Sequence, residues 1–111
     1  MEGFVSGDIV IIDFPFSDLK ITKRRPVLIL KVPRGDDIIV AQITSSSYEK
    51  PVEVLLEENS FRKGGLKRES FVRIDKIASI EKSLIKYKAG SLKQEKFDEI
   101  LNKIISFLKE N

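Results

Sequence analysis

The sequence predicts a mainly β protein that forms a small barrel and ends in one α-helix. Short runs of β-branched and aromatic residues recur between turn signals, which is the spacing of small barrels. The pattern then changes, because apolar residues near the C-terminus repeat at three- and four-residue steps, as on one face of a helix. With 111 residues and 41% hydrophobic content, the chain has the size of one compact domain, expected to span residues 1–111.

The first three strands are predicted from apolar runs between breakers. A Gly-Asp pair precedes the run at 9–14, and the turn signal at 33–37 separates the runs at 27–32 and 38–44. Proline has no N–H for a strand ladder, so Pro26 is expected to be the first residue of the second strand. The runs on either side of the turn therefore indicate a hairpin.

The later strands are less regular and are separated by longer polar stretches. We predict them at 52–56, 70–75 and 76–80. The stretches 44–51 and 57–69 are expected to be loops inside the same domain.

The C-terminal segment is predicted to be a helix that covers the core. Its apolar residues are Phe97, Ile100, Leu101, Ile104, Ile105 and Leu108. Gly90 supplies a break, and Ser91 with Gln94 three residues later resembles a capping box, so the helix is expected from about residue 92 to 109.

The composition narrows the possible chemistry. The chain has no cysteine and no histidine, which excludes disulfides, the usual structural zinc ligands and the commonest general base, and no cofactor is expected. Its 20 Lys and Arg residues against 17 Asp and Glu give a net charge of +3, a mild basic excess that permits binding to polyanions. Neither a targeting segment nor a membrane-spanning stretch is evident, so a soluble, cytoplasmic protein without membrane contact is expected.

Arg25 is the strongest candidate for a binding residue. It ends a cationic loop directly before Pro26, and a residue before proline is held in an extended conformation. A guanidinium stays charged at physiological pH, and its fork of donors matches a phosphate. Nucleic acid is therefore the first partner to consider.

Arg73 and Asp75 form a second candidate pair. Because successive side chains of a strand point to opposite faces, these two residues share a face, with Cα atoms roughly 6.5 Å apart. That spacing suits an acid–base pair, and it equally suits an ion pair within a sheet.

Polar residues at strand ends and in loops supply further candidates. Thr44 and Ser45 end a predicted strand with hydroxyls able to donate to phosphate oxygens, although such clusters also make turns. The loop residues are either solvated or lie along a nucleic-acid backbone, and they include Ser17, Lys20, Lys23, Arg24 and Arg68.

Four segments together resemble the MazF/PemK toxin family across almost the whole chain. They are Gly7-Asp8-Ile9-Val10, Arg25-Pro26-Val27-Leu28-Ile29, Gln42-Ile43-Thr44-Ser45 and Val72-Arg73-Ile74-Asp75. The resemblance implies an SH3-like β-barrel, a homodimer, and metal-independent endoribonuclease activity on single-stranded RNA that a cognate antitoxin restrains. It also implies that Arg25 and Thr44 form the core of the active site, with Arg73 and Asp75 contributing acid–base chemistry.

The implied reaction leaves a 2′,3′-cyclic phosphate and a 5′-hydroxyl. It needs a base for the 2′-hydroxyl, donors for the phosphorane oxygens and a proton for the leaving oxygen. Asp75 is the expected base, and Arg25 and Thr44 are expected to stabilise the developing charge. Two alternatives remain open, a non-catalytic module that binds nucleic acid or protein on the same barrel and a toxin with a protein target.

Overall fold

The computed structural model describes residues 3–15, 22–47 and 50–110. These residues form seven strands, three short 3₁₀ turns and one α-helix. The strands are β1 (Asp8–Pro15), β2 (Thr22–Lys31), β3 (Asp37–Thr44), β4 (Glu53–Leu56), β5 (Phe61–Gly64), β6 (Ser70–Glu81) and β7 (Ile85–Leu92). The turns are η1 (Lys50–Val52), η2 (Glu58–Ser60) and η3 (Lys82–Leu84), and the helix is α1 (Gln94–Lys109).

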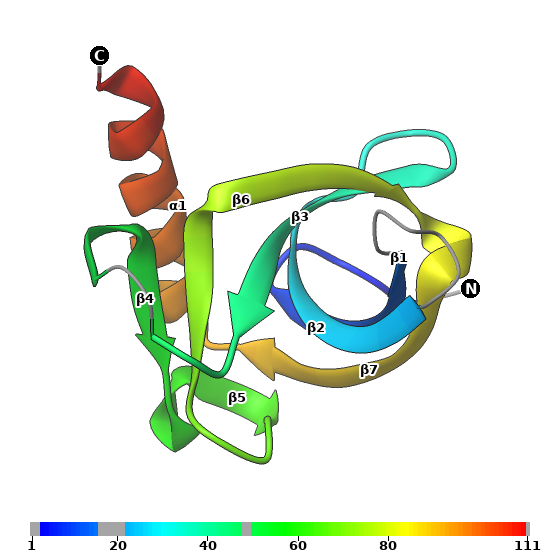
Figure 1. The fold of residues 1–111 in the computed structure, drawn as a ribbon, viewed down its shortest axis with the longest axis horizontal. Helices are drawn as coiled ribbons and strands as arrows, with labels where there is room; N and C mark the ends of the chain where they lie inside the picture. The colour runs from blue at the N-terminus through cyan, green and yellow to red at the C-terminus, as the bar shows by residue number, and fades with distance from the viewer. Residues whose placement is uncertain (1–2, 16–21, 48–49, 111) are drawn as a thin grey trace.

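All of these strands belong to one antiparallel sheet with the order β4-β6-β3-β2-β1-β7-β5. Its two edges, β4 and β5, are separated in the sequence only by residues 57–60. A link of that length reaches about 14 Å when fully extended, so the edges must approach each other and the sheet must curl. Figure 1 shows β6, β2 and β7 bending around a common interior, with α1 beside β6. The predicted mainly β fold with a C-terminal helix is confirmed.

Apolar residues cover both faces of the first three strands, because side chains alternate between the faces. Val27 and Ile29 belong to one buried cluster, whereas Leu28 belongs to the other. The cluster of Leu28 also contains Phe97, Ile100 and Ile104 of α1. The helix therefore covers one face of the sheet, as its periodicity predicts.

Two strands differ in extent from the prediction. Pro26 lies inside β2 rather than at its start, at a point where β1 pairs with the strand but β3 does not, since the β3 ladder begins at Val27. A missing N–H is tolerated at such a position. β6 is one continuous strand, and the register shift between Ala41 and Ile43 of β3 leaves residues 73–76 of β6 without a partner in β3.

β5 and β7 are the elements that the sequence patterns did not predict. β5 lies inside the segment 57–69, expected to be a loop, and β7 fills the segment before the helix. Ser91 is part of β7 and does not cap the helix, which begins after Lys93 without a side-chain cap. The Ser91 hydroxyl instead donates a 2.7 Å hydrogen bond to Asp8, so tertiary pairing replaces the expected local cap.

Candidate active site

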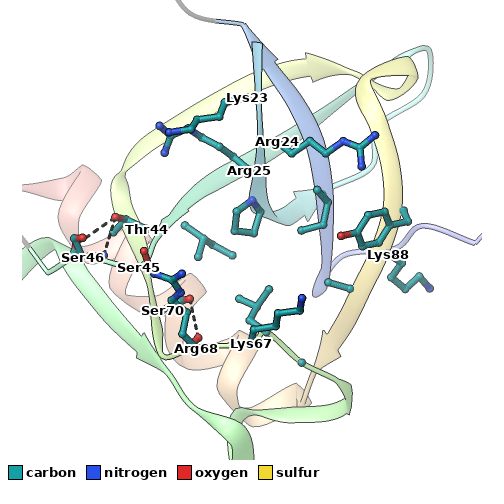
Figure 2. Close-up of a pocket in the computed structure, with 17 residues that line it drawn as sticks. Lys23, Arg24, Arg25, Thr44, Ser45, Ser46, Lys67, Arg68, Ser70 and Lys88 are labelled. Carbon is teal, nitrogen blue, oxygen red and sulfur yellow. Dashed lines mark hydrogen bonds between the residues drawn. The ribbon is translucent and has the colours of Figure 1, made fainter. Parts of the chain in front are cut away.

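A hollow of about 810 Å³ lies where the start of β2 and the end of β3 meet residues 65–70 and the middle of β7. Its apolar lining comes from Ile11, Pro26, Ile43, Leu66 and Ala89, which are buried or partly buried. Six cationic residues also line it, namely Lys23, Arg24, Arg25, Lys67, Arg68 and Lys88, together with the hydroxyls of Thr44, Ser45, Ser46, Ser70 and Tyr87. Figure 2 shows the labelled cationic and hydroxyl residues around the hollow. Among the lining residues of the described segments none is acidic, so the hollow favours an anionic ligand.

Arg25 and Thr44 lie just beyond the end of the β2–β3 ladder. Val27 pairs with Gln42, and each of the two residues lies two positions farther along its own strand, where both line the hollow. Residues two apart on a strand share a face, so both side chains lie on the face of Val27 and Gln42. Both residues are partly buried, and the Nε atom of Arg25 is buried. The two residues expected to form the active-site core therefore border one hollow.

Thr44 also organises the turn that follows β3. Its Oγ1 accepts a hydrogen bond from the backbone N–H of Ser46 and donates one to the Ser46 carbonyl, each at 3.2 Å. Such a turn holds Ser45 and Ser46 at the edge of the hollow. A ligand oxygen that accepts from Thr44 replaces only the carbonyl of Ser46, because a hydroxyl has one donor and two acceptor sites.

The cations of β2 point in different directions. Figure 2 shows Lys23 and Arg25 extending to one side of the strand and Arg24 to the other, as strand alternation requires. The Nε atom of Arg24 lies 3.6 Å from Asp13, which also pairs with Lys86 at 3.1 Å. Arg24 is thus partly neutralised, whereas Lys23 makes no ion pair with another described residue.

Of the other residues predicted to bind RNA, some line the hollow and some lie outside the described residues. Ser45 and Arg68 are exposed and line the hollow. In the part of the chain that the structure describes, the side chains of Lys23, Lys67 and Arg68 make no ion pair. Ser17 and Lys20 lie outside the described residues.

Arg73 and Asp75 pair with each other on β6. Arg73 donates from Nε to Oδ1 and from Nη2 to Oδ2 of Asp75, each at 2.8 Å, and neither residue lines the hollow. The hydrogen bonds from Arg73 lower the pKa of Asp75 from its ordinary value of 3.8, against the opposing effect of burial. Thr44 pairs with Phe71, and Arg73 and Asp75 follow two and four residues later in β6, past the register shift with β3. The ion pair therefore lies along β6 from Thr44 and outside the hollow.

A buried network under Lys88 escaped the sequence patterns. Asp8 is 1% exposed and accepts hydrogen bonds from the Ser91 hydroxyl and from the N–H of Val5. Its Oδ2 lies 3.2 Å from the Nζ atom of Lys88, which also donates to the Gly3 carbonyl at 3.0 Å. The Gly-Asp pair thus anchors a cation of the hollow, and the partner could only be found once β1 was paired with β7.

The structure adds Tyr87 to the residues of the site and places there Lys67, a loop cation for which the sequence left binding and solvation open. Tyr87 lies in β7, which was not predicted, so no signal marked it. Lys67 is next to Arg68 in a polar segment of the sequence. Only its position at the hollow indicates that it is a binding residue and not simply a solvated lysine.

Two further properties concern membranes and metals. Of the helices within the described residues, none has the length and apolar character needed to cross a membrane. Within residues 3–15, 22–47 and 50–110, no group of three or more acidic side chains is arranged to hold a metal ion.

Solved toxin structures share this architecture. A MazF structure from Deinococcus radiodurans aligns with a TM-score of 0.76 at 20% identity over 99% of this chain and all (100%) of its own. An endoribonuclease bound to its cognate antitoxin, from a mycobacterial species, aligns with a TM-score of 0.75 at 16% identity over 98% of both chains. The Mycobacterium tuberculosis toxin MazF-mt6 aligns with a TM-score of 0.69 at 22% identity over 92% of this chain and 98% of its own. The likeness extends over nearly the whole fold.

Sequence comparison identifies the family independently of the fold. A search of curated protein sequences gave no match. The family model described as the PemK-like, MazF-like toxin of type II toxin-antitoxin systems matches residues 6–108, which include every strand and nearly all of α1. The chain therefore belongs to the PemK-like, MazF-like toxin family of type II toxin-antitoxin systems.

Proposed function

We propose that this toxin is a sequence-specific endoribonuclease that cleaves single-stranded RNA, including mRNA, in the hollow beside Arg25 and Thr44. The observation that carries the proposal is the convergence of these two residues at a hollow lined by six cations. An RNA backbone supplies the anionic groups that such a lining attracts. The likeness to solved endoribonucleases of the same fold supports the proposal.

The reaction proceeds by attack of a 2′-hydroxyl oxygen on the adjacent phosphorus. The 2′-hydroxyl gives its proton to a base, the new P–O2′ bond replaces the P–O5′ bond, and the leaving 5′-oxygen takes a proton from water, which leaves a 2′,3′-cyclic phosphate and a free 5′-hydroxyl. The Arg25 guanidinium pairs with the non-bridging oxygens, and the Thr44 hydroxyl donates to one of them. Both contacts strengthen as negative charge develops on these oxygens in the transition state. This charge stabilisation comes from side chains, so the proposed reaction requires no metal ion.

Proton transfer is where Arg73 and Asp75 enter the proposal. The sequence predicts Asp75 as the base, although it lies four residues along β6 from Phe71, the partner of Thr44, and outside the hollow. In the structure its carboxylate is held by Arg73, and a lowered pKa makes it a weaker base. Catalysis by Asp75 therefore requires it to leave Arg73 when RNA binds, whereas Arg25 needs no such rearrangement.

The partners of the toxin follow from the same family. We infer a cognate antitoxin that restrains the activity, and the solved mycobacterial endoribonuclease of this fold in complex with its cognate antitoxin supports this inference. A homodimer and action in the cytoplasm, where mRNA is available, complete the proposal.

The test is cleavage of a long unstructured RNA in excess EDTA, with new ends mapped by primer extension. We expect cuts by the wild type that carry cyclic phosphate and 5′-hydroxyl ends. Arg25→Ala removes the guanidinium and Thr44→Val removes only the hydroxyl, and both are expected to lose at least about 100-fold in rate. Thr44→Ser keeps the hydroxyl and serves as the matched control.

Three outcomes are informative. Retained cutting by Arg25→Ala would remove that residue from the mechanism. Activity that disappears in EDTA and returns with a divalent cation would overturn the metal-independent reaction. Salt-dependent RNA binding without any new ends would identify a non-catalytic binding module.

A further inference from the structure

One row of apolar residues crosses three strands at the hollow. Ile11 of β1 pairs with Pro26 of β2 on one side and with Tyr87 of β7 on the other, and all three line the hollow. Residues directly opposite each other in a sheet point to the same face, so their side chains form a continuous strip. Tyr87 is 54% exposed, whereas Ile11 and Pro26 are partly buried beside it. The strip is therefore accessible at its aromatic end.

Charged groups border this strip. Arg24, two residues before Pro26, pairs with Asp13, two residues after Ile11, and Asp13 pairs in turn with Lys86. Lys88 follows Tyr87 in β7 and is held by the buried carboxylate of Asp8. An exposed aromatic ring thus stands between cations in a hollow whose described lining has no acidic residue. A ligand that fits has a flat apolar face attached to an anionic group.

We propose that Tyr87 is a stacking platform for a nucleobase next to the scissile phosphate, and that it helps determine which base is accepted there. This inference rests on the proposed function, since it requires RNA in the hollow. Each nucleotide combines a π-face with a phosphate, which is the combination that Tyr87 and the neighbouring cations offer. Ile11 and Pro26 extend the apolar surface beneath the base, and Lys88 lies where it contacts the adjoining phosphate.

The tyrosine content of the chain allows a direct test. The sequence contains two tyrosines, Tyr48 and Tyr87, and no tryptophan. A Tyr48→Phe protein therefore reports the emission of Tyr87 alone, and a Tyr87→Phe protein reports that of Tyr48. The probe is a decamer of 2′-O-methyl RNA of mixed sequence, which the proposed reaction cannot cleave because the attacking hydroxyl is blocked. We expect the decamer to quench Tyr87 emission, because stacking on a base quenches tyrosine fluorescence.

Affinity measurements separate the ring from its hydroxyl. Tyr87→Leu removes the aromatic face and is expected to weaken binding of a labelled decamer by roughly 5- to 150-fold, the range for loss of one base stack. Tyr87→Phe keeps the face and is expected to bind within about twofold of wild type. Thermal unfolding and size-exclusion chromatography of each variant check that the fold and the oligomeric state are unchanged.

The outcomes distinguish this inference from the proposed function. Wild-type binding without quenching, together with a Tyr87→Leu variant that binds equally well, would overturn the platform and leave RNA cleavage intact. A loss of affinity in Tyr87→Leu explained by an altered oligomeric state would also overturn it, by assigning Tyr87 to a protein interface. Failure of the wild type to bind the decamer even at low salt would overturn the platform and the proposed RNA substrate together.

Discussion

Arg73 and Asp75 are joined by two parallel hydrogen bonds, from Nε to Oδ1 and from Nη2 to Oδ2, each 2.8 Å long. The two residues are neighbours on one face of β6, and both are largely covered, with side-chain exposures of 15% and 25%. A bidentate pair of this kind fixes both side chains geometrically. It also links the protonation of Asp75 to the stability of the fold.

The pair predicts a loss of stability in acid. Arg73 lowers the pKa of Asp75 in the folded state, so the folded protein binds this proton less readily than the unfolded chain. The stabilisation is complete above the unfolded pKa, about 4, and is lost as the pH falls through the lower folded pKa. Asp75→Asn should lower the free energy of unfolding by about 1 kcal/mol at pH 7. Urea unfolding of both proteins at pH 7 and pH 2.5 measures the effect, and an undiminished difference at low pH would contradict it.

Cleavage rates should rank the proposed catalytic residues by their position. Arg25 borders the hollow whereas Asp75 lies outside it, so Arg25→Ala is expected to slow cleavage by at least about 100-fold and Asp75→Asn by about tenfold. Single-turnover rates at saturating RNA provide the comparison, with unfolding curves to confirm that each variant is folded. Equal losses would instead support Asp75 as the base and a rearranged ion pair in the RNA complex.

The backbone contact between β5 and β7 predicts a strong effect of one methyl group. A Cβ on Gly90 would lie 2.7 Å from the Lys63 carbonyl and 2.8 Å from the Gly65 nitrogen. Gly90→Ala is therefore expected to destabilise the protein by roughly 1–3 kcal/mol and to displace the segment that carries Lys67 and Arg68. Gly65→Ala, whose Cβ would meet only Phe61 at 4.0 Å, is the matched control. Unfolding curves that are superimposable for the two variants would refute the argument.

The salt dependence of RNA binding should report how many phosphates the cations of the hollow neutralise. Lys67 and Arg68 line it and make no ion pair within the described residues. For single strands each neutralised phosphate contributes about −0.7 to the slope of log K against log salt, so replacing both by Gln should reduce the slope by about 1.4. Lys103→Gln with Lys109→Gln on α1 removes the same charge away from the hollow and should leave the slope unchanged. Fluorescence anisotropy with an uncleavable single-stranded decamer from 50 to 300 mM salt gives both slopes.

Asp8 should be important for stability although it is not proposed to take part in the reaction. Asp8→Ala leaves the Ser91 hydroxyl and the Val5 N–H without their acceptor and is expected to cost about 3 kcal/mol of unfolding free energy. Ser91→Ala alone should cost about 1 kcal/mol. The double variant should be less destabilised than the sum of the two, because they share one hydrogen bond. Strict additivity in denaturant unfolding would show that the bond contributes little.

Much of the fold could be predicted because most elements have local signals. The runs in β1, β2, β3 and β4 are bounded by Gly, Pro or Asp, and the periodicity of α1 is evident from Phe97 to Leu108. β5 and β7 lack such signals, because lysines and glycines interrupt their alternation and each depends on pairing with a strand distant in the sequence. The predicted capping box at Ser91 was wrong because of a contact with a residue distant in the sequence. The Ser91 hydroxyl donates to the buried carboxylate of Asp8 and does not cap the helix.

The candidate site was predictable to the extent that strand ends mark it. Arg25 before Pro26 and Thr44 at the end of β3 are visible in the sequence, and both line the hollow just beyond the end of the β2–β3 ladder. Tyr87 and Lys88 could not be predicted as site residues, because nothing in the local sequence distinguishes them from exposed residues of a polar segment. The two-residue spacing of Arg73 and Asp75 suits an acid–base pair and an ion pair within the sheet equally well. Only the side-chain geometry reveals the ion pair.

The position of β7 in the sheet has a consequence for the synthesis of this chain. β1 lies between β2 and β7, so the first of the seven strands is flanked on one side by the last of them. Tyr87, Lys88 and Ala89 complete the hollow only after ribosomal synthesis has passed β7. A nascent chain that still lacks this strand has no complete hollow, so the proposed RNA site forms only once β7 has been made and has paired with β1.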